Sequence, residues 1–428
     1  TLVFPLEVVA WLGRVICWSL CALMLFRIGQ SLGLRSLAIA LCVSAWILTG
    51  QSLVAHSWVF GGFEAKSVSY VLYLAAIYRA IRQQEIVAGL FAGLAFSFHP
   101  AVGALGWLSL VCGMAMARGG IRNVLRFAIA SAVGAIPGLV PTVGVLFAEL
   151  TGESSPAALS YLVHVRMPHH LDALSWSRES IVALVAAAVF NIAWAWQLRR
   201  SPLWRSVIGF QIGLAAPFAI GYVAQAVGAY GLLVYTPFRL FPLLTPLLFF
   251  LCLASVVRYG GRNGAVRKLI PVAVLFLASM PGIIGGLHQN LVFTLESWRN
   301  TPSDLHKALT WASDSLPQDA RFLVAPWDRD VWYQLQRPVV VNHVYFPYSN
   351  LAEWLERSQN VYGTPPRSAA WPQREAVIRE NFAELTEAAI LDLKDVYQID
   401  YVISRTEYPF TVVHRRGNVV VYEVSGRN

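Results

Sequence analysis

Two charged residues flank the start of an apolar segment at residues 61–66, which read GGFEAK. A carboxylate here, Glu64, could act as a general base or bind a metal, and the ammonium of Lys66 could hold a phosphate. A plainer interpretation is an acid in the first turn of a helix beside a lysine that extends to the membrane interface. Lys66 is the only lysine among the first 267 residues, which favours a role in binding. Glu64 is therefore the candidate catalytic residue and Lys66 a candidate substrate ligand.

A second group of ionisable side chains lies in the segment 150–179. It consists of His164, Arg166, His169, His170 and Asp172, all candidate substrate-binding residues. Imidazoles and carboxylates are ligands of divalent metals, so Glu64, His169, His170 and Asp172 are also candidate ligands of Mg²⁺ or Mn²⁺. Adjacent histidines on a regular element point apart, so a complete metal site needs partners from elsewhere. An ordered amphipathic loop at the level of the lipid headgroups explains the same residues without a site.

Two further candidates lie within apolar sequence. His99 precedes Pro100 between the apolar segments 85–99 and 101–117, where it could cap the turn or contact a substrate. Arg239 is expected several residues inside an apolar helix, and charges within a membrane usually face a partner or a cavity. Its guanidinium could bind a phosphate through two hydrogen bonds, or extend outward to the interface.

These residues belong to a chain whose composition excludes an ordinary soluble enzyme. Of its 428 residues, 56% are hydrophobic and 13% charged, whereas soluble domains carry roughly 25% charged residues. It is also too apolar and aromatic to be disordered. Residues 1–288 hold 19 Lys and Arg against 7 Asp and Glu, while residues 289–428 hold 14 against 17. The basic excess is thus confined to the apolar part, and a nucleic-acid partner is not expected.

Ten apolar segments have about the length of a membrane-spanning helix. They are 5–27, 35–53, 66–82, 85–99, 101–117, 124–148, 180–198, 204–226, 233–257 and 269–287. Alternate connections are rich in arginine, and such connections face the cytoplasm. The 54–66 loop, the 149–179 loop and the C-terminal tail are then external. Residue 1 is external too, so we expect one further helix and an external loop ahead of it.

The tail from about residue 300 predicts a small α/β domain. We expect a helix over 303–315 with Ser303 as its N-cap, helices over 347–357 and 372–397, and short strands. The strands are expected at 321–325, 338–342, 401–404, 411–414 and 419–424. Aromatic residues of the tail, among them Trp327, Trp332 and Tyr333, could stack on sugar rings, although core packing explains them equally well and is the interpretation we favour.

The expected fold is therefore a polytopic all-α membrane domain over residues 1–288, with about ten helices here and about eleven in the full protein. A small external α/β domain over residues 289–428 follows it. The helix start at Glu64-Ala65-Lys66, the Phe98-His99-Pro100 hairpin and the outer loop ending in 167–172 complete the pattern.

This pattern resembles the GT-C superfamily of integral-membrane glycosyltransferases, which use polyprenyl-phosphate-linked sugar donors. It is also similar to bacterial membrane proteins of unknown function that end in a small external α/β domain. The GT-C resemblance implies a principal catalytic acid in the first external loop, expected here ahead of residue 1. It implies further catalytic or metal-binding acids in the next external loop, where Glu64 lies.

The resemblance leads to one leading prediction and two alternatives. The first is transfer of a sugar from a lipid-phosphate donor to an acceptor at the outer face of a bacterial inner membrane, with the C-terminal domain in the periplasm. The second is a transporter or flippase for a lipid or an anionic solute, which predicts inverted repeats and charges at the membrane midplane. The third is a non-catalytic membrane scaffold whose tail binds a partner.

Overall fold

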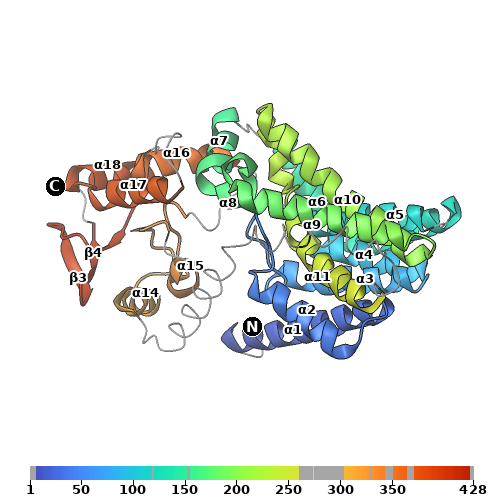
Figure 1. The fold of residues 1–428 in the computed structure, drawn as a ribbon. Helices are drawn as coiled ribbons and strands as arrows, with labels where there is room; N and C mark the ends of the chain where they lie inside the picture. The colour runs from blue at the N-terminus through green and yellow to red at the C-terminus, as the bar shows by residue number, and fades with distance from the viewer. Residues whose placement is uncertain are drawn as a thin grey trace. The chain divides into compact units, whose positions relative to one another are not determined.

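The chain divides into two compact units. The computed structural model describes residues 6–117, 120–151, 155–259, 273, 303–327, 330–342, 350–363 and 371–424. One unit comprises Thr1–Leu146 and His169–Leu291, and the other comprises Phe147–Pro168 and Val292–Asn428. Figure 1 shows that the first unit is helical and that the strands all belong to the second. The second unit thus takes in residues 147–168 as well as the tail.

The helical unit is built from helices of two length classes. The longer helices are α1 (Leu6–Ser31), α6 (Ile121–Thr151), α9 (Arg178–Gln197), α10 (Pro202–Ala226) and α11 (Phe241–Tyr259). The shorter ones are α2 (Ser36–Leu48), α3 (Ala65–Ile81), α4 (Glu85–Phe98) and α5 (Pro100–Met116), with α8 (Pro168–Leu171) and the 3-10 turns η2 (Ala173–Ser175) and η3 (Tyr230–Tyr235) between them.

Within the described residues, five helices are long and apolar enough to cross a membrane, one in each of α1, α6, α9, α10 and α11. Within these residues the number is lower than the ten expected for the whole chain. The shorter helices have 13 to 17 residues. At 1.5 Å per residue they extend roughly 20–26 Å, less than the hydrocarbon core of about 30 Å. The tenth expected segment, 269–287, lies outside the described residues.

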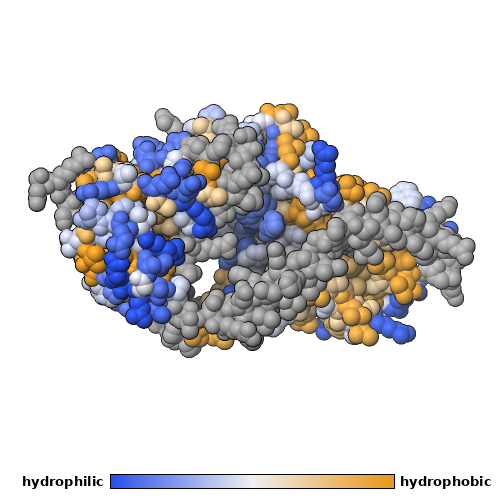
Figure 2. All heavy atoms as spheres, turned by 60° about the vertical axis from the view of Figure 1, so that its left-hand side comes forward, coloured by the Kyte–Doolittle hydropathy of each residue, from blue (hydrophilic) through white to orange (hydrophobic). Residues whose placement is uncertain are grey.

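Large apolar side chains are exposed mainly on the helical unit. Among the described residues, all exposed large hydrophobic side chains except Trp332, Val396 and Val412 lie between Val8 and Tyr259. Figure 2 shows such side chains gathered on the visible helices, whereas hydrophilic side chains predominate over the C-terminal elements. Exposed apolar surface of this extent marks a membrane-facing region, as in a multi-pass membrane protein.

Glycines allow the helices of this unit to approach at backbone distance. A Cβ atom on Gly93 of α4 would lie 2.1 Å from the carbonyl oxygen of Ser131 in α6. In the same way, a Cβ on Gly209 of α10 would lie 2.2 Å from the carbonyl oxygen of Cys112 in α5. Both glycines belong to G-x-x-x-G patterns, which bring apolar helices together through small residues.

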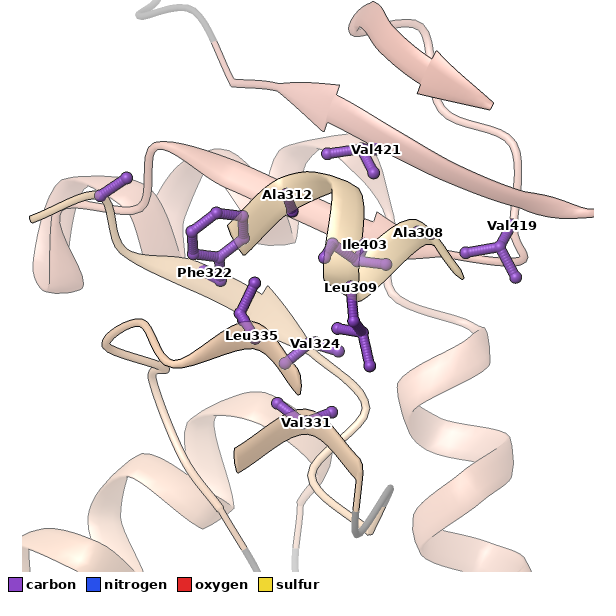
Figure 3. Packing of buried hydrophobic residues seen from close by; sticks show 11 residues of the cluster. Ala308, Leu309, Ala312, Phe322, Val324, Val331, Leu335, Ile403, Val419 and Val421 are labelled. Atoms are coloured by element: carbon purple, nitrogen blue, oxygen red, sulfur yellow. The ribbon is translucent and has the colours of Figure 1, made fainter. Parts of the chain in front are cut away.

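The second unit folds around a four-stranded sheet of order β1-β2-β4-β3. Its strands are β1 (Phe322–Val324), β2 (Tyr401–Ser404), β3 (Thr411–Arg416) and β4 (Val419–Glu423). β1 and β2 are parallel, and the other pairs are antiparallel. Helix α14 (Asp304–Ser315) covers the sheet with Ala308, Leu309 and Ala312, which pack among Phe322, Val324, Ile403 and Val421 (Figure 3).

The remaining elements of this unit are short helices. They are α7 (Pro156–Tyr161), the π-helical turn η1 (Leu162–Arg166), α15 (Asp330–Leu335), α16 (Leu351–Tyr362), α17 (Trp371–Ala383) and α18 (Glu387–Tyr397). The N-cap prediction at Ser303 is confirmed, because its hydroxyl accepts a hydrogen bond from the backbone N–H of His306 at 3.1 Å. The single helix expected over 372–397 is two helices, since Thr386 caps the start of α18.

The strand expected at 338–342 is wrong. This segment makes one isolated bridge, between Val339 and Phe322. The guanidinium of Arg357 donates a hydrogen bond to the carbonyl oxygen of Val340 at 3.2 Å. In a longer strand pairing, this carbonyl would accept from a backbone N–H of the neighbouring strand.

The close approach of α4 and α6 yields a test of the fold. We expect Gly93→Ala to lower the free energy of unfolding by about 1–3 kcal/mol, because the added methyl group overpacks a backbone contact. Thermal unfolding of the detergent-solubilised protein measures this. Gly144→Ala in α6 is the matched control, since a Cβ there meets nothing within 4 Å. Equal melting temperatures for the two variants would contradict the packing described.

Candidate functional site

The loop between α2 and α3 is ordered by one buried amide. The side-chain carbonyl of Gln51 accepts hydrogen bonds from the backbone N–H groups of Val59 and Phe60, both at 2.8 Å, and its amide donates to the Phe60 carbonyl at 2.9 Å. The indole N–H of Trp46 contacts the carbonyl oxygens of Gln51 at 2.5 Å and Leu243 at 3.0 Å. The loop is thereby attached to α11.

This loop positions a tryptophan over Lys66. The ammonium lies 3.5 Å from the centroid of the Trp58 ring and 3.1 Å from the carboxylate of Glu64. Gly61 makes the arrangement possible, because a Cβ there would lie 2.2 Å from the Trp58 ring. The side chain of Lys66 is 19% exposed, whereas that of Glu64 is 53% exposed. The cation is therefore held in place while the carboxylate remains accessible.

Arg239 contacts His99. Its Nη1 lies 2.8 Å from the imidazole Nε2. A guanidinium can only donate, so Nε2 is the acceptor in this contact and the imidazole is neutral. The backbone N–H of Val102 also points at Nδ1, at 3.3 Å, and is the weaker of the two contacts. His99 is at the same time the N-cap residue of α5.

The position of Arg239 corrects the expectation of a residue inside a helix spanning 233–257. Residues 230–235 form the turn η3, Thr236 has a left-handed φ of 50°, and α11 begins only at Phe241. Proline explains the break, because Pro237 and Pro242 disfavour helix in the residues before them. Arg239 thus precedes the N-terminal end of α11.

Three imidazoles lie beside these charges. The rings of His169 and His170 are 4.1 Å apart between centroids, and His56 lies 6.0 Å from His169. Nδ1 of His170 lies 2.5 Å from the carbonyl oxygen of Ala55 and donates to it, since a carbonyl can only accept. His170 thus joins α8 to the loop between α2 and α3.

Asp172 contacts the end of α10. Its carboxylate is buried and accepts a hydrogen bond from the side-chain amide of Gln225 at the end of α10. Within the described residues, no three His, Cys, Asp or Glu side chains gather as a metal site. The arrangement therefore does not fit the expected metal set of Glu64, His169, His170 and Asp172, and Mg²⁺ or Mn²⁺ stays a prediction.

His164 and Arg166 belong to the second unit, in η1. Their predicted role in substrate binding stays a prediction. The structure therefore brings together six of the candidates, which are Glu64, Lys66, His99, His169, His170 and Arg239. We call these six residues the outer cluster.

The electrostatics of the outer cluster favour an anion. The positive charges of Lys66 and Arg239 are near enough to repel each other, and both also disfavour a positive charge on His99 and His170. Glu64 supplies one compensating negative charge beside Lys66. Helices α3, α5 and α11 all begin at this cluster, with the partial positive charge of their first N–H groups.

Comparison with known proteins adds no family to this description. No protein-family model matches the sequence, and no curated protein matches it significantly.

Residues that the sequence did not single out complete the site. Trp58 and Gln51 have no charge and stand in an apolar stretch, so residue type alone gave no reason to choose them. The paired glycines at 61 and 62 were the available signal, because they permit close packing of a large ring.

The buried imidazole of His170 predicts a pH dependence. Burial lowers its pKa to about 3, and the nearby charges of His169, Arg239 and Lys66 act in the same direction. An unfolded histidine titrates near 6.5. The unfolded state therefore binds more protons between these values, and stability present above pH 6.5 is lost as the pH falls toward 3.

We expect His170 to account for about 2 kcal/mol of the unfolding free energy that the wild-type protein loses between pH 7 and pH 5. His170→Asn keeps an N–H donor for Ala55 but does not titrate, so its loss over this range should be smaller by that amount. Thermal unfolding at the two pH values measures the difference. His306→Asn in the second unit is the control. An unchanged pH dependence in His170→Asn would show that His170 does not carry it.

Proposed function

We propose that this protein transfers a sugar from a lipid-phosphate donor to an acceptor at the outer face of a bacterial inner membrane. The observation that supports the proposal is the meeting of Lys66 and Arg239, with neutral His99 between helix starts, in the outer cluster. Two cations with one carboxylate leave a positive charge, which suits a phosphate group. External chemistry suits a lipid-linked donor, because nucleotide sugars are confined to the cytoplasm.

An apolar cavity along the same helices supports an amphiphilic ligand. It is lined by residues of α1, α3, α5, α10 and α11, including Leu74, Leu110 and Leu247. Leu74 follows Lys66 by eight residues on α3, which is about 12 Å along the helix axis. A ligand with its phosphate at Lys66 and Arg239 could therefore lay a hydrocarbon chain along this cavity.

The reaction follows from the positions of the charges. Glu64 accepts the proton of an acceptor hydroxyl, and that oxygen forms a bond to the anomeric carbon of the sugar. The bond between this carbon and the phosphate oxygen breaks, and the phosphate keeps the electron pair. Lys66 and Arg239 stabilise the negative charge that develops on the leaving phosphate. Glu64 then returns its proton to water, to which its side chain is exposed.

The phosphate site predicts a bound lipid. Native mass spectrometry of the gently extracted protein should detect a polyprenyl phosphate or its glycosylated form. We expect Lys66→Ala and Arg239→Ala to reduce the bound fraction at least tenfold, because each removes a phosphate contact. Arg178→Ala, an exposed arginine at the start of α9, is the control. Bulk phospholipid alone, unchanged in these variants, would remove the support for the phosphate site.

The catalytic assignment predicts a loss of turnover. With the lipid so identified as donor, we expect Glu64→Gln to slow transfer by at least about 100-fold, the usual contribution of a general base. Glu179→Gln, at the start of α9, should leave transfer unchanged. Full activity in Glu64→Gln would exclude Glu64 as the base. Movement of labelled lipid across liposomes with no covalent change would instead establish the transporter alternative.

A further inference from the structure

A pocket in the second unit has the features of a small-molecule site. Its volume is about 380 Å³, within the range of ligand pockets in proteins. It is lined by residues of α15, of the segment 337–342 and of α16. These are Trp332, Arg337, Pro338, Val339, Val340, Val341, Asn342, Glu353, Trp354 and Arg357.

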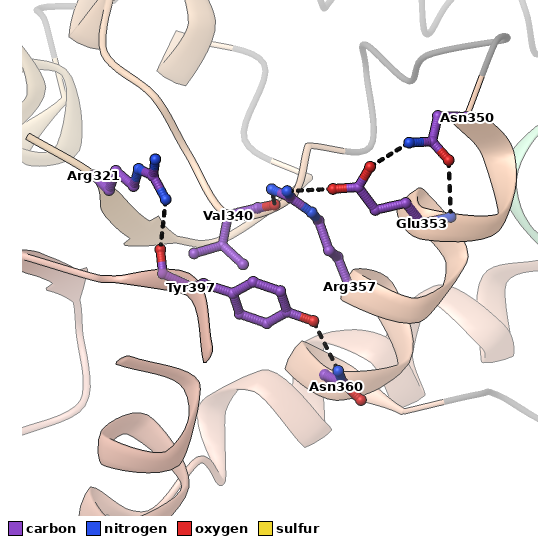
Figure 4. A network of polar contacts seen from close by, with 7 residues as sticks. All are labelled: Arg321, Val340, Asn350, Glu353, Arg357, Asn360 and Tyr397. Atoms are coloured by element: carbon purple, nitrogen blue, oxygen red, sulfur yellow. Dashed lines mark hydrogen bonds and ion pairs between the residues drawn. The ribbon is translucent and has the colours of Figure 1, made fainter. Parts of the chain in front are cut away.

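A hydrogen-bonded network fixes one wall of the pocket (Figure 4). Glu353 is held from both sides, since one of its carboxylate oxygens accepts from Arg357 and the other from the amide of Asn350. The guanidinium of Arg357 also donates to the Val340 carbonyl and lies 5.4 Å from the ring centroid of Tyr397. The side chains of Glu353 and Arg357 are 45% and 37% exposed. They therefore present fixed polar groups to a ligand.

The guanidinium groups of this wall are already engaged in contacts within the protein. Arg357 is paired with Glu353, and Arg337 donates to carbonyl oxygens at the end of α14, including those of Ser313, Leu316 at 3.3 Å and Pro317 at 3.0 Å. An anion would have to displace these contacts to reach either guanidinium. The pocket is therefore suited to a neutral ligand that offers several hydroxyl groups.

Trp332 supplies an apolar surface beside this wall. Its side chain is 57% exposed, unlike Trp354, which is 4% exposed and donates its indole N–H to the Asn342 carbonyl at 3.0 Å. The C–H groups on one face of a sugar ring pack against the negative face of an aromatic ring. Core packing, the interpretation favoured from the sequence for Trp332, does not agree with a side chain exposed to this extent.

We propose that this pocket binds a sugar ring, with Trp332 as its stacking surface and Glu353, Arg357 and Asn342 as partners of its hydroxyl groups. The inference does not require that the outer cluster transfers a sugar. It adds a saccharide site in a different unit of the chain.

Saturation-transfer NMR tests the proposal on the full-length protein in lauryldimethylamine oxide, a detergent without a sugar headgroup. The probes are glucose, mannose, arabinose and N-acetylglucosamine, each present alone. We expect saturation of the ring protons of at least one sugar. That signal should fall at least fivefold in Trp332→Ala and in Glu353→Gln, and return in part in Trp332→Tyr, which keeps an aromatic face.

Trp196→Ala is the matched control, because Trp196 is similarly exposed, at 51%, but lies in α9 of the helical unit. Should Trp332→Ala fail to fold, Glu353→Gln and Trp332→Tyr carry the test. The proposal is overturned by the absence of transfer to all four sugars, or by equal transfer in wild type and the pocket variants. A signal lost in Lys66→Ala but kept in Trp332→Ala would place the sugar at the outer cluster and also overturn it. Sugar binding without any bound lipid phosphate would leave this proposal standing while the proposed function fails.

Discussion

The contact between Arg239 and His99 is the interaction on which the outer cluster depends. A guanidinium cannot accept a hydrogen bond, so this contact requires a neutral imidazole. It also joins the residues before α11 to the start of α5 at 2.8 Å. With His99 neutral, the positive charge of the cluster resides on Lys66 and Arg239. A protonated His99 would add a third cation and lose this contact.

The loop between α2 and α3 has a strained backbone conformation, which hydrogen bonds stabilise. Gln51, Ala55 and His56 adopt left-handed φ angles of 65°, 64° and 41°, which are unfavourable for residues with a Cβ. The amide of Gln51 and the indole of Trp46 hold this conformation through hydrogen bonds to the backbone. Strained backbone is often found at binding sites, where the surrounding structure imposes it. Here it directs the Ala55 carbonyl to His170 and sets Trp58 beside Lys66.

The sequence predicted elements well where one local signal dominates. Ser303 capped its helix as expected, and the strand at 401–404 was found in place. Prediction from the sequence failed where contacts with residues distant in the chain determine the local structure. Nothing local in residues 338–342 reveals that Arg357 binds the Val340 carbonyl. The turn before α11 was also missed, because the helix over 233–257 was predicted from hydropathy alone. Hydropathy does not take into account the effect of Pro237 and Pro242 on backbone conformation. The gathering of Lys66, Arg239 and the histidines depends on tertiary packing, which residue spacing alone does not encode.

The glycine contacts have a mechanical consequence. Helices that touch at their backbones cannot slide past one another without collision, so α4 with α6, and α5 with α10, each behave as a rigid body. His99 stands at the junction of α4 and α5 and is therefore fixed to both bodies. The position of His99 in the outer cluster is therefore set by the packing of four helices, α4, α5, α6 and α10.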